Sequence, residues 1–320
     1  MPKVVFFTLL DPDVTKLILD CAPRDWDINT HSLSISDDKK IEILKDADFL
    51  LLFPEEISNR VLKSAPNLKL IQLISAGYDL IDINTCNALG IPVANNGGTN
   101  AIDVAEYALA LILAFYRHII VQDQNARTGN WEFSAPSLDI YTICGKTAGI
   151  IGLGKIGKHV AKLLSAFGAK VFYYDPIRIS KENEQQIGVS YATLDFLLHE
   201  ADIISLHVPI TDATRHMIGK HAFSLMKPTT LLVNTCRGEV IEEHELINAL
   251  QEKRILGAAL DVLDKEPPDM DNPIRRMENV LLTPHIAGRT WDTWPRRGQF
   301  VFQNMMRVWK GEPPLSLVHE

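Results

Sequence analysis

The stretch "GIIGLGKIGKHVAKLLSAFGAKVFYYDP" (149–176) contains the pattern that decides the fold of this chain. An apolar run ends at Ile151, and the residues from Gly152 to Gly157 form the sequence G-x-G-x-x-G before an expected helix. A second apolar run, "AKVFYY", follows this helix and leads to Asp175, 18 positions after the last glycine. A glycine pattern alone is a weak signal. With a strand before it, a helix after it and an acid at this distance, it is typical of a dinucleotide-binding unit.

The glycines and the helix start each have a physical role in such a unit. Gly152 permits the tight turn, Gly154 lets the backbone approach a pyrophosphate, and Gly157 lets the helix pack closely against the strand. The N–H groups at the helix start, around Lys155 and Ile156, supply a site for an anion. A glycine-rich turn that binds no ligand is the alternative interpretation.

Asp175 and Arg178, which follow the second strand, bear on the choice between NAD and NADP. A carboxylate at Asp175 can accept hydrogen bonds from both ribose hydroxyls and would repel a 2′-phosphate, so the sequence favours NAD over NADP. Arg178 lies three residues further on and argues in the other direction, because an arginine at this place can pair with a phosphate.

The composition limits the classes of protein to which the chain can belong. Its 320 residues suit two domains, and its 46% apolar and 22% charged residues are typical of a globular protein. A net charge of -8 argues against general nucleic-acid binding, which needs an excess of Lys and Arg. The four cysteines have no metal-ligand spacing, so we expect reduced thiols, no metal site and a cytoplasmic location. The longest apolar region (104–116) is too short to span a membrane.

Apolar runs alternate with helix-like stretches along the first hundred residues. The runs at 3–10, 46–53 and 68–75 are expected to be strands, with helices at 11–22 and 58–66. Near-continuous apolar runs are what parallel strands covered on both faces require, so the expected class is α/β with parallel sheets. A further helix is expected after Asn100, its N-cap. This helix is apolar nearly all round, so we expect it to be buried in a core or at an interface between subunits.

Polar side chains follow four more expected strands, in "ADIISLHVPIT" (201–211), "TTLLVNTCRG" (229–238), "ILGAALDVLDKEPP" (255–268) and "ENVLLTPHIAG" (278–288). Their ends deliver in turn His207 and Pro209, Cys236 and Arg237, Asp261 followed by Glu266, and His285. Ligands of open α/β sheets bind beyond these carboxyl ends.

Three of these residues form a usable catalytic set. An arginine such as Arg237 can grip a carboxylate with two parallel hydrogen bonds, and a histidine such as His285 can donate or accept a proton near neutral pH. A carboxylate such as Glu266, bonded to the other ring nitrogen, orients the imidazole and favours its protonated form. Each residue alone would be interpreted as an ordinary polar group at a strand end; their occurrence together favours catalysis.

The chain resembles the D-isomer-specific 2-hydroxyacid dehydrogenase family in seven segments, which run in the family's order and span most of the chain. They are "SAGYDLID" (75–82), "NAIDVAEYALALIL" (100–113), "GIIGLGKIGKHVA" (149–161), "LHVPIT" (206–211), "NTCRGEVIEEHELINAL" (234–250), "GAALDVLDKEP" (257–267) and "LLTPHIAGRT" (281–290). The resemblance implies that Arg237 binds the substrate carboxylate and carbonyl, that Glu266 supports the histidine, and that His285 is the acid–base group. It also implies substrate contacts at Ala76, Gly77 and Asn100, and cofactor contacts at Lys155, Ile156, Asp175, His207, Pro209, Cys236 and Asp261 beside the glycines.

The resemblance further implies an architecture of two Rossmann-like parallel-sheet domains. Residues 1–99 and 290–320 would form a substrate-binding domain and residues 100–289 an NAD-binding domain, with the active site in the cleft between them. We expect a homodimer that binds NAD and a small 2-oxo or 2-hydroxy acid, and that binds neither nucleic acid nor a membrane.

The expected function is NAD-dependent interconversion of a 2-oxo acid and a D-2-hydroxy acid by hydride transfer. In the alternative interpretation the protein is an NAD-sensing corepressor with little turnover, because some relatives of that kind keep the same Arg/Glu/His set. The sequence leaves the substrate open among glyoxylate, hydroxypyruvate, a phosphorylated acid and a bulkier oxo acid. We expect the loops near Phe53–Pro54 and Tyr78, and the segment 289–297, to select its side chain.

The segment "RTWDTWPRR" (289–297) resembles no family signature beyond Thr290, yet it is rich in large and charged side chains. These are Arg289, Trp291, Trp294, Arg296 and Arg297. One hypothesis is that the arginines bind an extra anionic group of the substrate. The other is that the segment is a packed and solvated helix start, and the sequence leaves both open.

Overall fold

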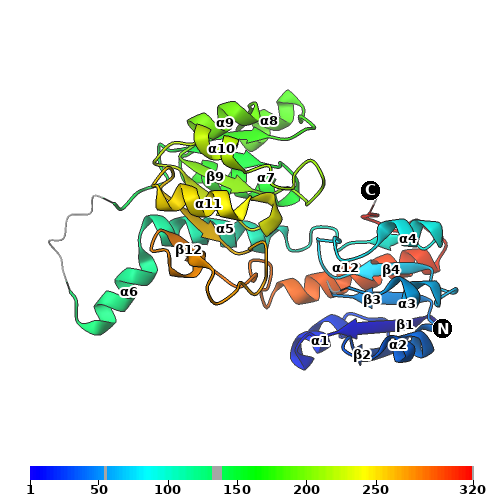
Figure 1. The fold of residues 1–320 in the computed structure, drawn as a ribbon. Helices are drawn as coiled ribbons and strands as arrows, with labels where there is room; N and C mark the ends of the chain where they lie inside the picture. Colours follow the sequence, from blue (N-terminus) through cyan, green and yellow to red (C-terminus); the bar gives the residue numbers. More distant parts are fainter. Residues whose placement is uncertain (54–55, 132–138, 319–320) are drawn as a thin grey trace. The chain divides into compact units, whose positions relative to one another are not determined.

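The computed structural model describes residues 1–53, 56–131 and 139–318, and the chain divides into two compact units (Figure 1). The first unit comprises Met1–Asn100 and Arg289–Glu320, and the second comprises Ala101–Gly288. Each unit has its own parallel sheet, which confirms the predicted α/β class. The assignment of one unit to the substrate and the other to NAD stays a prediction.

The first unit is built on a five-stranded parallel sheet in the order β2-β1-β3-β4-β5. The strands are β1 (Lys3–Thr8), β2 (Asp27–Ser32), β3 (Phe49–Leu52), β4 (Leu70–Leu73) and β5 (Val93–Ala94). Its helices are α1 (Pro12–Leu19), α2 (Asp37–Leu44), α3 (Asn59–Lys63), α4 (Ile83–Ala88) and α12 (Thr293–Trp309). The predicted strands at 3–10, 46–53 and 68–75 are confirmed as β1, β3 and β4, each shorter than its apolar run.

Both faces of this sheet are covered by apolar side chains. Leu50 and Leu52 belong to one core cluster, and Phe49 and Leu51 belong to the cluster on the opposite face. The second cluster includes Val301, Phe302 and Met305 of α12, which packs against α1 and β4. The helix α12 therefore contributes apolar side chains to the core of the first unit.

The second unit is built on a seven-stranded parallel sheet in the order β12-β11-β10-β9-β6-β7-β8. The strands are β6 (Thr147–Ile151), β7 (Lys170–Tyr174), β8 (Val189–Tyr191), β9 (Ile203–Leu206), β10 (Leu231–Asn234), β11 (Gly257–Leu260) and β12 (Val280–Leu282). Its α-helices are α5 (Ala101–Tyr116), α6 (Ile119–Thr128), α7 (Lys155–Ala166), α8 (Lys181–Ile187), α9 (Leu194–Glu200), α10 (Lys220–Leu225) and α11 (Glu243–Gln251). Two short 3₁₀ helices, Gly238–Val240 and Pro273–Arg276, complete it.

The order of these strands reverses at β6. From β6 the chain adds β7 and β8 on one side, and it then crosses back to add β9, β10, β11 and β12 on the other side. Ligands of open α/β sheets bind beyond the strand ends at such a reversal. The loop after β6, which carries the glycine pattern, is therefore placed where the topology favours a ligand.

The long apolar helix α5 is buried except for a stripe formed by Ile102, Glu106 and Ala110. Val104, Ala108 and Ile112 are buried, whereas Ile102 is 46% exposed. The predicted burial in a core is therefore confirmed for most of the helix, and its burial at an interface between subunits stays a prediction. Among the described residues, no single helix is long and apolar enough to cross a membrane, although α5 and α6 together, bent by 56°, reach that length and composition.

Candidate active site

The loop between β6 and α7 has glycines where the backbone needs them. Gly152 has a φ of 92°, and a Cβ atom at this position would lie 2.6 Å from the carbonyl oxygen of His207. A Cβ atom on Gly157 would overlap the carbonyl oxygen of Gly152, so the helix approaches the strand closely only with glycine at this position. The turn and the close packing of helix on strand thus account for two of the three glycines.

The remaining glycine faces open space, as a dinucleotide site requires. A Cβ atom on Gly154 would meet nothing within 4 Å. Gly154 is also the N-cap of α7 and, having no side chain, makes no capping hydrogen bond of its own. Because the first N–H groups of an α-helix have no acceptor within the helix, this loop and helix start fit the pyrophosphate of a nicotinamide dinucleotide.

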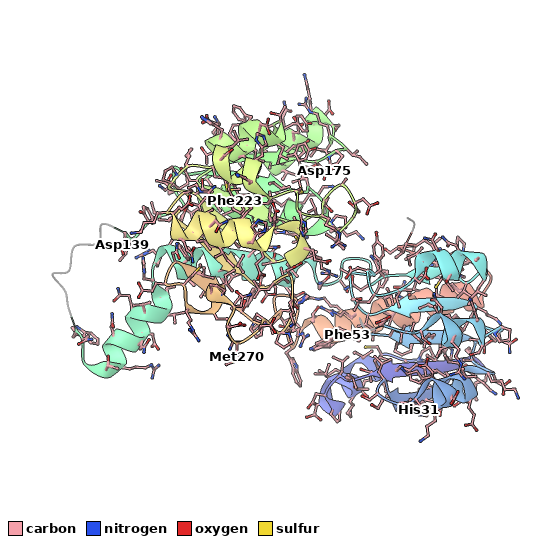
Figure 2. The ribbon with its side chains drawn as sticks, in the orientation of Figure 1. His31, Phe53, Asp139, Asp175, Phe223 and Met270 are labelled. Carbon is pink, nitrogen blue, oxygen red and sulfur yellow. The ribbon has the colours of Figure 1, made fainter. Side chains whose placement is uncertain are left out.

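Asp175, labelled in Figure 2, follows β7 directly and is fixed beside the glycine loop. Its Oδ2 atom accepts a hydrogen bond of 2.8 Å from the N–H of Leu153, and its Oδ1 atom accepts one of 2.9 Å from the N–H of Ile177. These two bonds set the orientation of the carboxylate. An anionic acceptor beside the glycine loop fits a ribose with free hydroxyls.

The end of β9 places His207 against this loop. Its Nε2 atom lies 2.8 Å from the hydroxyl of Ser205, and its Nδ1 atom is buried with no hydrogen-bond partner among the described residues. Burial lowers the pKa of His207, so the ring is neutral near pH 7. Pro209, two residues further on, is exposed.

Cys236 lies beyond the end of β10, and its thiol has low reactivity. Burial raises the pKa of its thiol to about 11, and the Sγ atom lies 3.1 Å from Oδ1 of Asn234. Because the thiolate is the reactive form, this cysteine is poorly placed to act as a nucleophile.

His285 and Glu266 form the central pair of the second unit. The Nδ1 atom of His285 lies 2.7 Å from Oε2 of Glu266, and both side chains are partly exposed, at 45% and 37%. The strand predicted to end at His285 ends earlier, at Leu282. His285 instead lies in the loop after β12 with a φ of 53°, and its N–H donates to the carbonyl oxygen of Asp261 at 2.8 Å.

Asp261 organises the loop that carries the histidine. It is 1% exposed, and its carboxylate accepts hydrogen bonds from the hydroxyl of Thr283 (2.6 Å) and from the N–H groups of Ile286 (3.0 Å) and Ala287 (2.8 Å). A buried carboxylate is stable only with such partners. The resemblance placed Asp261 near the cofactor, and sequence reasoning missed its role as the anchor of the His285 loop. The position of this acid, directly after a buried strand, was the available signal.

Glu266 is held in its ionised form. Burial by itself raises the pKa of this carboxyl, but the hydrogen bond and charge of His285, the N–H of Leu263 at 3.1 Å and the charge of Arg237 together bring the pKa below its ordinary value. The side chain can therefore orient the imidazole at neutral pH. Glu266 and His285 also line a cavity of about 490 Å³, together with Asp261, Leu263, Pro267, Pro268, Arg275, Leu282, Thr283 and Pro284.

Arg237 follows β10 and belongs to the same end of the sheet. Its Nη1 atom donates to the carbonyl oxygen of Cys236 at 2.7 Å, and its own carbonyl accepts from the amide of Asn234 at 2.8 Å. A Cβ atom on the next residue, Gly238, would overlap the backbone of Leu263, so this loop packs directly on the loop that leads to Glu266. The second unit thus brings together the arginine, the acid and the histidine.

In the first unit, the carbonyl groups of the loop after β4 accept hydrogen bonds from neighbouring residues of the same unit. The carbonyl oxygen of Ser75 accepts from the N–H of Asn96 at 2.9 Å, and that of Ala76 accepts from the amide of Asn95 at 3.0 Å. The carbonyl oxygen of Gly77 accepts from the hydroxyl of Ser75 at 2.7 Å. The N–H groups of Ala76 and Gly77 donate to no acceptor among the described residues, so they are available to an anion. Asn100 is buried and accepts from the amide of Asn96 at 3.1 Å.

The arginines and tryptophans of the segment 289–297 separate into buried and exposed residues. Arg297 is 4% exposed, and its guanidinium lies 4.7 Å from the ring of Trp294, which is also buried. Arg289 is exposed, with its guanidinium 5.9 Å from the ring of Phe53, and Trp291 is 69% exposed. Arg296 is partly buried. Pro54, expected to help select the substrate, lies outside the described residues.

Comparison with known proteins decides the family. The sequence model of the "D-isomer specific 2-hydroxyacid dehydrogenase, NAD binding domain" matches residues 109–287. The chain belongs to the D-isomer-specific 2-hydroxyacid dehydrogenase family. Over 283 residues it is 39% identical to a glyoxylate reductase of Korarchaeum cryptofilum, a match that covers 88% of this chain and 85% of the relative.

Solved structures of two other proteins have the same fold. The NAD complex of the 2-hydroxyacid dehydrogenase of Lactobacillus delbrueckii ssp. bulgaricus matches with a TM-score of 0.83 and 28% identity, covering 99% of this chain and 100% of that one. An acyclic imino acid reductase in complex with NADPH and D-Arg matches with a TM-score of 0.86 and 29% identity, with the same coverage.

As a member of this family, the chain is an oxidoreductase that interconverts 2-oxo acids and D-2-hydroxy acids with a nicotinamide dinucleotide, as the sequence predicted. The corepressor alternative gains no support from these comparisons.

Proposed function

We propose that this enzyme reduces a short 2-oxo acid of the glyoxylate class with NADH. The observation that carries the proposal is the 2.7 Å contact between His285 and Glu266, in the same unit as Arg237 and the glycine loop. The substrate class is supported by the glyoxylate reductase of K. cryptofilum, with which the chain shares 39% identity.

NADH, held at the glycine loop, would supply the hydride for reduction of the carbonyl group. The Arg237 guanidinium binds the substrate carboxylate and carbonyl oxygen, and the protonated His285 donates its Nε2 proton to that oxygen. Glu266 accepts the hydrogen bond of Nδ1, which fixes the ring and favours the protonated imidazole. Arg237 and the imidazolium together stabilise the negative charge that develops on the oxygen, a contribution of about 3 kcal/mol for each well-placed donor.

We assign substrate binding to residues 1–99 and 290–320, and cofactor binding to residues 100–289. The free N–H groups of Ala76 and Gly77 would hold the substrate carboxylate, and Asn100 would be a further contact. The cofactor would be bound by Gly152, Gly154, Lys155, Ile156, Gly157, Asp175, His207, Pro209, Cys236 and Asp261. The carboxylate of Asp175 supports a preference for NAD over NADP, because it would repel a 2′-phosphate.

A panel of 2-oxo acids, each assayed with NADH and with NADPH, tests the substrate and the cofactor preference. We expect the highest kcat/KM with glyoxylate or hydroxypyruvate and NADH. A phosphorylated or bulky 2-oxo acid at the head of the ranking would contradict the proposed substrate class. Higher activity with NADPH would contradict the proposed cofactor.

Two variants test the catalytic roles. His285→Ala and Arg237→Ala should each lower kcat/KM at least ~100-fold. His199→Ala is a matched control, because the exposed His199 also contacts a carboxylate, that of Glu200 at 3.0 Å, but lies on α9. Near-normal turnover by either test variant would refute its assignment.

We also propose that the enzyme is a cytoplasmic homodimer that uses α6 as a contact. Figure 1 shows α6 projecting from the second unit, and none of its residues is buried. Its first turn exposes Ile119, Ile120 and Val121 by 52–57%, an apolar face that a second copy would cover. Ile120→Glu should reduce the molar mass measured by light scattering. Ile177→Glu, at an equally apolar residue that is 80% exposed, should not.

A further inference from the structure

Arg178, the residue that argued for NADP in the sequence, is held by an acid of the following helix. Its Nε atom lies 2.7 Å from Oε1 of Glu184, and its Nη2 atom lies 3.0 Å from Oε2 of the same carboxylate. Glu184 belongs to α8, six residues further along the chain. This two-bond geometry is the strongest arrangement that arginine forms with a carboxylate.

Glu184 is itself fixed from the opposite side. The hydroxyl of Tyr173 donates to its Oε1 atom at 2.9 Å and accepts from the N–H of Ile179 at 3.2 Å. Only 10% of the Glu184 side chain is exposed. The hydrogen bond from Arg178 is the main reason why the pKa of this carboxyl lies below its ordinary value, so Glu184 is ionised at neutral pH.

The guanidinium of Arg178 also contacts an aromatic ring. The Cζ atom of Arg178 lies 5.0 Å from the centre of the Tyr191 ring, and this ring packs edge-on against that of Tyr173 at 5.5 Å. A carboxylate in the guanidinium plane and a ring on its face therefore fix the group on two sides. Arg178 could offer Nε and Nη2, the pair that grips an anion with two parallel bonds, to a phosphate only by leaving Glu184, which would then be a buried charge without its partner.

We propose that Glu184 contributes to cofactor specificity by holding Arg178, so that the Nε and Nη2 atoms of the arginine are not available to bind a 2′-phosphate. This inference rests on the proposed preference for NAD. In a dinucleotide-binding unit an acid after the second strand favours NAD, whereas a nearby arginine accommodates the phosphate of NADP. This chain carries both residues. Because Glu184 binds the arginine, the carboxylate of Asp175 is the group that determines which dinucleotide is preferred.

The variants Glu184→Gln and Glu184→Ala test the proposal by direct binding. We would measure Kd for NADH and NADPH from their fluorescence, and Kd for ADP-ribose and 2′-phospho-ADP-ribose by calorimetry. Release of Arg178 should tighten binding of the two phosphorylated ligands at least ~10-fold, and binding of the two unphosphorylated ligands should change less than ~3-fold. The calorimetric measurement needs no turnover, so it is independent of catalysis.

Two controls show whether a change in Kd comes from the release of Arg178 or only from the loss of one negative charge. Glu182→Gln removes the same charge from the exposed first turn of α8, and it should leave all four Kd values nearly unchanged. Adding Arg178→Ala to Glu184→Gln should abolish the gain for the phosphorylated ligands. If Glu184→Ala fails to fold, Glu184→Gln keeps the size of the side chain and carries the test.

The possible outcomes distinguish the two proposals. If the unmodified enzyme binds NADPH as tightly as NADH, the proposed preference for NAD is wrong. If it prefers NADH but both Glu184 variants behave like Glu182→Gln, or if the gain survives Arg178→Ala, the preference stands and the role of Glu184 is overturned. A gain for phosphorylated ligands that depends on Arg178 supports the proposal.

Discussion

The imidazole of His285 and the carboxylate of Glu266 meet at 2.7 Å through Nδ1 and Oε2, although the two residues follow different strands. Each is held by its own loop. The N–H of His285 donates to the carbonyl oxygen of Asp261, and Oε1 of Glu266 accepts from the N–H of Leu263. Because Nδ1 is occupied by the carboxylate, Nε2 is the ring nitrogen left to exchange a proton with a substrate.

The first prediction concerns Glu266→Gln, which keeps the shape of the side chain but removes its charge. We expect kcat/KM for reduction to fall ~10-fold to ~100-fold, because the imidazolium loses the anion that orients and stabilises it. The loss should appear in kcat more than in KM, and Kd for NADH should stay nearly unchanged, because the substituted side chain orients His285 and does not bind the cofactor. A normal kcat in steady-state assays of Glu266→Gln would show that Glu266 does not act through His285.

The second prediction concerns the stability of the fold at acid pH. Burial lowers the pKa of His207 from 6.5 to about 3, so between these values the unfolded chain binds a proton that the folded chain does not. The free energy of unfolding should therefore decrease as the pH falls below about 6.5, by at most ~1.4 kcal/mol per pH unit from this residue. Above that pH the residue should have no such effect.

Urea unfolding at pH 7.5, 6 and 5 measures this dependence. In His207→Asn the decrease between pH 7.5 and 5 should be smaller than in the unmodified enzyme. The exposed His199 provides the control, since His199→Ala should leave the dependence as it was. An equal slope for His207→Asn and the unmodified enzyme would refute the prediction.

The parts of the fold that sequence predicts best are those decided locally. The turn at Gly152 and the acid at Asp175 depend on residues within one strand–helix–strand unit, and Leu50 and its neighbours in β3 are so uniformly apolar that only a buried strand suits them. In contrast, β2 ("DINTHS") is a polar edge strand, and such a strand has no apolar pattern to reveal it.

The parts that sequence could not predict are the partners that charged side chains find in the folded chain. Arg297 is buried because Trp294 and the carbonyl oxygen of Ile74 lie beside it, whereas an arginine is ordinarily expected at the surface. The pairing of Arg178 with Glu184 depends on the turn between β7 and α8. The three hydrogen bonds that make Asp261 an anchor come from residues more than twenty positions away.

The third prediction concerns Asn95, which braces the loop after β4. Its amide donates to the carbonyl oxygen of Ala76 at 3.0 Å, and its Oδ1 atom accepts from the N–H of Gly97 at 3.0 Å. Asn95→Ala should let the Ala76–Gly77 peptide rotate, and KM for the 2-oxo acid should rise at least ~5-fold, the equivalent of about 1 kcal/mol.

The same variant should bind NADH normally, because the brace lies in the first unit and the glycine loop lies in the second. Comparison of KM for the 2-oxo acid with Kd for NADH therefore distinguishes a positioning role from general damage to the fold. Asn87→Ala, at an exposed position of α4, is the control. An equal rise of KM for the 2-oxo acid and of Kd for NADH would contradict the prediction, and so would no change in either.

The fourth prediction separates two arginines that the sequence could not tell apart. Arg297 is buried, stacks on Trp294, and donates to the hydroxyl of Thr293 at 3.3 Å and to the carbonyl oxygen of Ile74 at 3.4 Å. Arg297→Ala should lower the free energy of unfolding by about 3 kcal/mol, because it leaves a cavity and an unsatisfied buried carbonyl group. Arg289 is exposed beside Phe53 at the end of β3, so Arg289→Ala should change the stability by less than about 0.5 kcal/mol.

Arg289 is then the exposed arginine of the segment 289–297, and so the best placed to contact a second anionic group of a substrate, because Arg296 is partly buried. If it does so, Arg289→Ala should lower kcat/KM for 2-oxo acids that carry a second carboxylate or a phosphate, and spare glyoxylate. Arg289→Lys, which keeps the charge but loses the planar group, should retain part of the activity toward the doubly charged acids. Urea unfolding and the panel of 2-oxo acids together measure both effects. A substrate ranking that is the same in Arg289→Ala as in the unmodified enzyme would assign this arginine to the surface.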